Sequence, residues 1–153
     1  MDFYMSRKII KIKISASRGG FRCWQPNEIE EQSLTIKNNG QVWWNVTRTL
    51  TMEEIAKGFL NNNVRITEYK NIGKEKAKKI LEHAENFFKD KIDTEFKTFI
   101  CDASPDTVLI DYENDEWIFG QLNEFTYQSD DIEAFYDYLS EELLIENLFF
   151  FNN

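Results

Sequence analysis

The last third of the chain has no lysine, arginine or histidine. All 18 lysine and arginine residues lie in residues 1–97, which hold 13 acidic residues (27 − 14) and a formal charge of +5. Residues 98–153 hold the other 14 acidic residues, a charge of −14, and the total is −9. Separated charges of this kind create a field that steers oppositely charged molecules. We therefore distinguish a basic half (1–97) and an acidic half (98–153), and expect partners selected by charge.

Cysteine and histidine are scarce, which argues against several kinds of chemistry. Cys23, Cys101 and His83 are the only residues of these two types, fewer than the roughly four ligands of a structural zinc site. The distant cysteines indicate free thiols in a reducing compartment. No cysteine or aspartate near His83 in sequence could make it a base, so we interpret it as a partly buried structural residue. We expect neither a metal nor another cofactor.

Long apolar runs and glycine-rich phosphate loops are also missing. No segment approaches the roughly 18 apolar residues of a membrane span, and the N-terminus lacks the apolar core of a signal peptide. These absences predict a cytoplasmic protein without membrane contact. The chain is 42% hydrophobic and 15% aromatic, which is typical of a folded protein, and its 153 residues predict a single domain spanning 1–153.

Alternating apolar and polar residues predict an antiparallel sheet. The Asn38-Asn39-Gly40 turn predicts a tight hairpin between two of the strands. The predicted strands cover residues 8–16, 33–37, 41–50, 64–72, 107–112 and 116–122. In the fourth of them, Val64, Ile66 and Tyr69 are expected to point inward.

Helical periodicity marks two longer segments. One covers residues 74–90, and the other begins at Ser129 or Asp130 and runs to Leu143 or Leu144. Thr51 and Glu54 have the spacing of a capping box, which predicts a short helix over residues 52–60. We expect residues 148–151 to dock into the core. The fold class is α+β, with an antiparallel β-sheet of hairpins packed against two main amphipathic helices.

The acidic residues do not match a known catalytic or metal-binding motif. Asp111, Glu113 and Asp115 alternate like the start of a calcium loop, but Glu116 occupies the sixth position, where such a loop needs glycine. A metal nuclease built on Asp102, Asp106 and Asp111 would want a following lysine, and none occurs after residue 97. An inverting carboxylate pair stays open, because the sequence does not give distances in space.

We therefore expect the acidic residues to form a surface that binds a basic protein, with the last helix as its main part and the 111–117 turn second. The alternatives are a solvated helix face, or an acidic half that packs against the basic half of the same chain. The net charge argues against direct nucleic-acid binding, although a local patch of Lys8, Lys11, Lys13, Arg18 and Arg22 remains open. The candidate residues are Asp130, Asp131, Glu133, Asp137, Glu141, Glu142, Asp111, Glu113, Asp115, Glu116 and Trp117, with Phe119, Tyr127, Tyr136 and Tyr138 as further aromatic anchors.

The acidic, cysteine-poor, Asn- and Lys-rich chain, with the hairpin sequence Val-Leu-Ile-Asp-Tyr-Glu-Asn-Asp-Glu-Trp at 108–117, resembles small α+β proteins of phages of low-GC bacteria. In size and charge it is similar to anti-CRISPR proteins. That resemblance implies a non-enzymatic inhibitor of a Cas nuclease with its guide RNA, acting in the cytoplasm of a bacterial host cell, because these nucleases hold nucleic acid in basic channels. The alternatives are an intracellular immunity-type or regulatory binding module, or a small carboxylate-dependent hydrolase.

Overall fold

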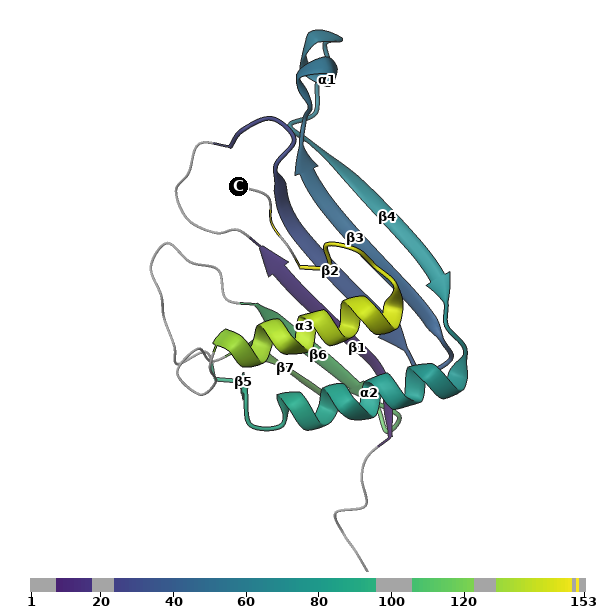
Figure 1. Cartoon of the computed structure of the whole chain (residues 1–153). Helices are drawn as coiled ribbons and strands as arrows, with labels where there is room; N and C mark the ends of the chain where they lie inside the picture. Colours follow the sequence, from purple (N-terminus) through teal and green to yellow (C-terminus); the bar gives the residue numbers. More distant parts are fainter. Residues whose placement is uncertain (1–7, 18–23, 96–105, 123–128, 150, 152–153) are drawn as a thin grey trace, which may run out of the picture.

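An antiparallel sheet with both long helices on one of its faces forms the protein (Figure 1). The computed structural model describes residues 8–17, 24–95, 106–122, 129–149 and 151, without the side chains of Ser129 and Asp130. The α+β prediction is confirmed. The strands are β1 (Ile9–Ser17), β2 (Ile29–Lys37), β3 (Gln41–Thr49), β4 (Asn63–Asn71), β5 (Ile92–Asp93), β6 (Thr107–Tyr112) and β7 (Trp117–Leu122), and the helices are α1 (Met52–Ala56), α2 (Lys74–Phe88) and α3 (Ser129–Leu143).

The strand order is β4-β3-β2-β1-β6-β7-β5, so β1 lies at the centre of the sheet. It pairs with β2 of the basic half on one side and with β6 of the acidic half on the other. The Lys11 ammonium lies 3.3 Å from the Asp111 carboxylate across the second of these pairs. The two halves of the sequence therefore share one sheet.

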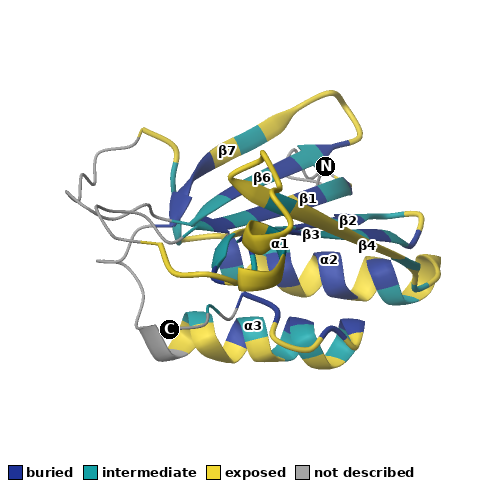
Figure 2. Ribbon diagram, turned by 90° about the horizontal axis from the view of Figure 1, so that it is seen from above, coloured by how far each residue is buried: buried dark blue, intermediate teal, exposed yellow. Residues whose placement is uncertain are grey.

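The core lies between the sheet and the two long helices (Figure 2). Period-two alternation turns one set of strand side chains toward the helices, and these are buried as the sequence predicts. The helices contribute the apolar stripes of α2 and α3. The main buried residues are Ile12, Ile14, Leu34, Ile36, Val42, Val108 and Ile110 from the strands, Ala77, Ile80, Leu81, Ala84 and Phe88 from α2, and Phe135, Leu139 and Leu143 from α3.

Several boundaries differ from the prediction. β2 begins at Ile29, four residues early, because Glu31 and its neighbours pair with β3 although their sequence does not alternate. α1 has only five residues, and Gly58 with φ +80° follows it. Ile66 is exposed rather than inward because it lies on the edge strand β4, where no described helix covers it. Tyr69 is exposed because its pairing with Trp43 places it on the face turned away from the helices.

The end of the described chain docks into the core, as predicted. Phe149 is buried, and its ring centroid lies 4.5 Å from that of Tyr136. Its backbone N–H donates a hydrogen bond of 2.6 Å to the side-chain oxygen of the buried Gln32. Phe151 is half-buried, while Phe150 lies outside the described residues. Within the described segments, no helix has the length and apolarity needed to cross a membrane.

Candidate functional site

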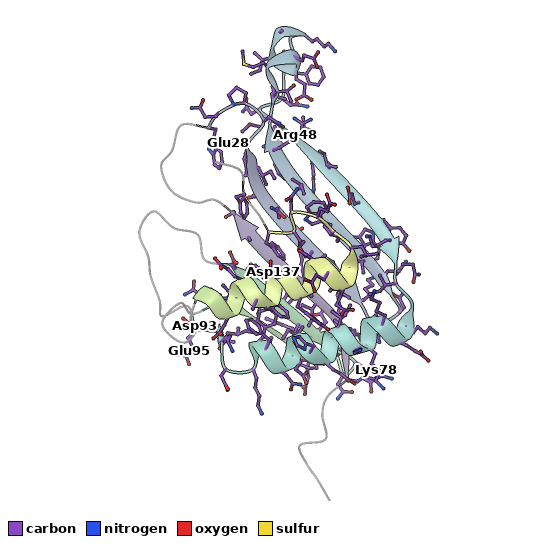
Figure 3. The ribbon with its side chains drawn as sticks, in the orientation of Figure 1. Glu28, Arg48, Lys78, Asp93, Glu95 and Asp137 are labelled. Atoms are coloured by element: carbon purple, nitrogen blue, oxygen red, sulfur yellow. The ribbon has the colours of Figure 1, made fainter. Side chains whose placement is uncertain are left out.

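Glu133, Asp137 and Glu141 line the outer face of α3, and we call these three residues the acidic ridge. Their spacing of four residues places them on one side of the helix, opposite the buried Phe135 and Leu139. All three side chains are exposed, and Figure 3 shows Asp137 on α3. Among the described residues, no ion pair joins the ridge to a cation of the chain.

Two other acids of α3 lie on its flank beside α2. Glu142 is half-buried, with its carboxylate 4.0 Å from the ammonium of Lys76. Asp131 lines a shallow hollow together with His83 and Lys91 of the α2 region. These acids therefore face cationic or titratable groups of the same chain. Of Asp130 only the backbone, which is helical, is described.

The turn between β6 and β7 forms a separate acidic set. Asp111 pairs with Lys11, and Glu113 lines a hollow that also includes Lys74 and Lys78 of α2. Figures 1 and 2 show this turn on the side of α2 that faces away from α3. Asp115 and Glu116 are exposed, but the turn and the helix do not form one continuous surface.

The expected aromatic anchors do not surround the ridge. Trp117 and Phe119 are exposed on β7, on the face of the sheet that is turned away from the helices. Tyr138 stacks on His83 with ring centroids 4.0 Å apart, and burial, followed by the charge of Glu142, raises its pKa. The Tyr136 hydroxyl lies 2.5 Å from a carboxylate oxygen of Asp106. Tyr127 lies outside the described residues. His83 is exposed, so our interpretation of it as partly buried is wrong.

Neither a metal centre nor a relative points to another site. Within the described ranges, no three His, Cys, Asp or Glu side chains come close enough to hold a metal ion. Asp102, one of the three acids weighed for a metal nuclease, lies outside those ranges. No protein-family model matches the chain. A comparison with curated proteins finds no match either. Inference about function therefore depends on the surfaces themselves.

The connection from β3 to β4 carries α1 away from the body of the protein, and we call residues 51–60 the hairpin tip (Figure 1). Four large apolar residues of the tip are exposed, and Leu60 is 97% exposed. No residue of α1 is buried. The sequence does not predict this exposure, because apolar residues in a folded protein are usually buried. The exposed residues are Met52, Ile55, Phe59 and Leu60.

Polar contacts, rather than burial, stabilise the conformation of the tip. Thr51 and Glu54 form the predicted capping box, with hydrogen bonds of 3.1 and 2.8 Å. The guanidinium of Arg48 in β3 donates two hydrogen bonds to the Glu54 carboxylate, at 2.7 and 3.1 Å. A five-residue helix is marginal in water by itself, so these contacts fix its shape.

The tip should make stability depend on pH in the acid range. The hydrogen bond from Arg48, followed by that from the Thr51 backbone, lowers the pKa of Glu54 from 4.5 to about 2. A carboxyl group whose pKa is lower in the folded state stabilises the folded protein at pH values above its unfolded-state pKa. This stabilisation is lost as the pH falls from 4.5 toward 2. We expect wild type to melt at a higher temperature than Glu54→Gln at neutral pH, and the difference to vanish near pH 2.

Thermal unfolding followed by circular dichroism at several pH values measures this difference. Glu53→Gln is the control, because Glu53 is an exposed neighbour outside the described ion pairs. A gap between wild type and Glu54→Gln that persists unchanged at the lowest pH would contradict a role for the ionised carboxylate.

Proposed function

We propose that the protein is a non-enzymatic inhibitor that binds a basic, nucleic-acid-processing protein through the acidic ridge of α3. The observation that carries the proposal is the contrast between the acids of the chain. Asp111 and Glu142 pair with the chain's own lysines, and Glu113 lines a hollow shared with two lysines. The ridge carboxylates, by contrast, are exposed and have no ion pair among the described residues. The ridge is therefore an acidic surface available to a partner, separate from the exposed Asp115 and Glu116 of the β6–β7 turn.

The energetics of the helix support the same proposal. Glu133 and Asp137, and likewise Asp137 and Glu141, are like charges four residues apart, an arrangement that destabilises a helix by about 0.2–0.5 kcal/mol per pair. Solvated helix faces usually mix charges of both signs, as α2 does with its lysines and glutamates. A basic partner would remove this repulsion, and charge complementarity would also speed association.

The specific partner follows from the resemblance to anti-CRISPR proteins. We propose a Cas nuclease with its guide RNA as the target, in the cytoplasm of a bacterial host cell. The basic channels of such a nuclease would accept a row of carboxylates at a site that otherwise holds phosphates. An immunity-type or regulatory module with a different basic partner would use the same ridge.

Surface plasmon resonance against a Cas nuclease–guide complex tests the proposal. Reversal of all three charges (Glu133→Lys, Asp137→Lys and Glu141→Lys) should weaken binding by roughly 10–100-fold, because attraction to a basic partner becomes repulsion. This corresponds to a loss of about 1.4–2.8 kcal/mol of binding free energy. Higher salt should weaken wild-type binding too, because exposed charges are screened.

A matched variant separates the position of the charges from their number. Glu53→Lys, Glu68→Lys and Glu82→Lys change three exposed acids outside α3, so the net charge changes equally. This control should bind almost as well as wild type. Equal losses in the two triple variants would contradict a specific role for the ridge. If wild type ignores the nuclease but binds another basic protein through the ridge, the Cas assignment is wrong.

A further inference from the structure

We propose that the face of the sheet turned away from the helices is a binding site for single-stranded nucleic acid. Side chains of every second strand residue form this surface, which we call the open face. Most of its residues are half-buried or exposed, Gln121 being a buried exception, whereas most strand residues of the opposite face are buried. No described helix covers it (Figure 2). The proposal does not depend on the acidic ridge or on its partner.

Cations gather on one part of the open face. Over β1 to β4 it carries Lys11, Lys13, Lys37 and Arg65, and the only acid there among the described residues is Glu31. On the adjoining strand β6, Asp111 lies on the same face and pairs with Lys11, so Lys13, Lys37 and Arg65 are the cations outside that ion pair. Directly paired like charges destabilise a sheet, yet Lys11 and Lys37 are cross-strand partners. Such a local concentration of positive charge fits a polyanion in a chain whose total charge is −9.

The total charge of −9 argues against nucleic-acid binding, but the fold places the acidic ridge and the open face on opposite sides of the protein. The acidic ridge lies on the outer side of α3, and α3 packs on the other face of the sheet (Figure 2). A helix with its side chains is about 10 Å across, and the Debye length at physiological salt is about 8 Å. Most of the repulsion from the ridge is therefore screened at the open face.

Aromatic side chains lie on both sides of the central cation. Trp43 and Tyr69 on β3 and β4 form a pair with ring centroids 5.4 Å apart, and Phe119 lies on β7. Register pairs place Trp43, Lys13 and Phe119 in one row across the sheet. Strands lie about 4.8 Å apart, so Trp43 and Phe119 are each about 10 Å from Lys13 and Tyr69 is about 14 Å away. Bases stack on such rings without regard to sequence, and a lysine between them can meet a phosphate.

Hydroxyl and amide groups fill the next row. Register pairs align Thr67, Asn45, Ser33, Ser15 and Thr107 across five strands. Four of them line a hollow of about 480 Å³ together with three charged residues, Lys13, Arg65 and Glu31. Serine, threonine and asparagine are common donors to phosphate and sugar oxygens. The open face thus combines aromatic platforms, cations and small polar donors, which are the elements of a sheet surface that binds single strands.

Fluorescence anisotropy with a labelled oligothymidine of about 12 nucleotides at physiological salt, about 0.15 M, tests the site, since such sites cover about 4–16 nucleotides. We expect a dissociation constant between about 10⁻⁶ and 10⁻⁴ M that weakens with salt. Lys13→Glu with Arg65→Glu should weaken binding at least about tenfold. Lys74→Glu with Lys78→Glu, an equal charge change on exposed lysines of α2, should have little effect.

A second pair of variants tests stacking. Tyr69 is exposed on an edge strand, so Tyr69→Ala should fold, and it should weaken binding at least about fivefold while Tyr69→Phe keeps wild-type affinity. The same sequence as a duplex should bind more weakly, because its bases are not available to the rings. Circular dichroism melting confirms that each variant is folded.

Several results would overturn the proposal. One is no anisotropy change at about 10⁻⁴ M protein, the weak end of the range for non-specific binding. Equal losses of affinity in the Lys13→Glu/Arg65→Glu variant and the Lys74→Glu/Lys78→Glu variant would show that binding does not occur at the open face. A duplex that binds as tightly as the single strand, or a Tyr69→Phe variant as weak as Tyr69→Ala, would exclude base stacking.

Discussion

Phe88→Ala should lower the free energy of unfolding by about 3–5 kcal/mol. Phe88 is completely buried in α2, and its ring centroid lies 5.1 Å from that of Phe135 in α3. Alanine would leave a cavity between the two helices and the sheet, a region too tightly packed to collapse fully. Equilibrium denaturation in urea measures the loss.

Phe59→Ala is the matched control for this prediction. It makes the same chemical change in the hairpin tip, where the Phe59 side chain is 49% exposed. We expect it to change stability by no more than about 0.5 kcal/mol. If the two variants lost the same amount, the packing of α2 against α3 would not be a major source of stability.

Gln32→Leu should lower the free energy of unfolding by about 2–4 kcal/mol, although it adds an apolar residue to the core. The side-chain oxygen of Gln32 accepts hydrogen bonds from the Trp44 indole at 3.1 Å and from the Phe149 backbone at 2.6 Å. Leucine would leave the buried Phe149 N–H and the half-buried Trp44 N–H without this acceptor. Urea denaturation, with hydrogen exchange at the Phe149 amide, measures the effect.

Gln41→Leu provides the comparison, because Gln41 is in β3 but its side-chain hydrogen bonds are exposed. That variant should stay within about 0.5 kcal/mol of wild type. A Gln32→Leu protein as stable as Gln41→Leu, with the Phe149 amide still protected, would show that the bridge contributes nothing.

Local periodicity in the sequence predicts most of the elements of the fold. Alternation identifies β1, β3, β6 and β7, and the helical stripes identify α2 and α3, because burial on one face imposes these periods. The start of β2 escapes this approach, since Glu30 and Glu31 break the alternation and pairing with β3 decides their conformation. The central position of β1 escapes it too, because its pairing with β6 depends on residues far away in the sequence.

For the candidate site, the sequence predicts which residues are acidic and which share a helix face, but not which of them pair with lysines. The sequence groups 14 acids into one half of the chain, and their spacing along α3 indicates a common face. It does not tell which acids meet lysines, since Lys76 approaches Glu142 only through the packing of α2 beside α3. The residue rows of the open face could not be predicted from local sequence patterns either. They join side chains of separate strands, and the register of those strands is known only from their pairing.

The central position of β1 also matters while the chain is being made. Ser17 precedes Thr107, the first residue of β6, by 90 residues (107 − 17). At about 5–20 residues per second, a ribosome needs roughly 5–20 s to supply the second partner of this isoleucine-rich strand. Until then one edge of β1 is unpaired and could join a strand of another nascent chain. Lys11 and Lys13 interrupt the apolar run of β1, so we expect their charges to oppose such aggregation until β6 arrives.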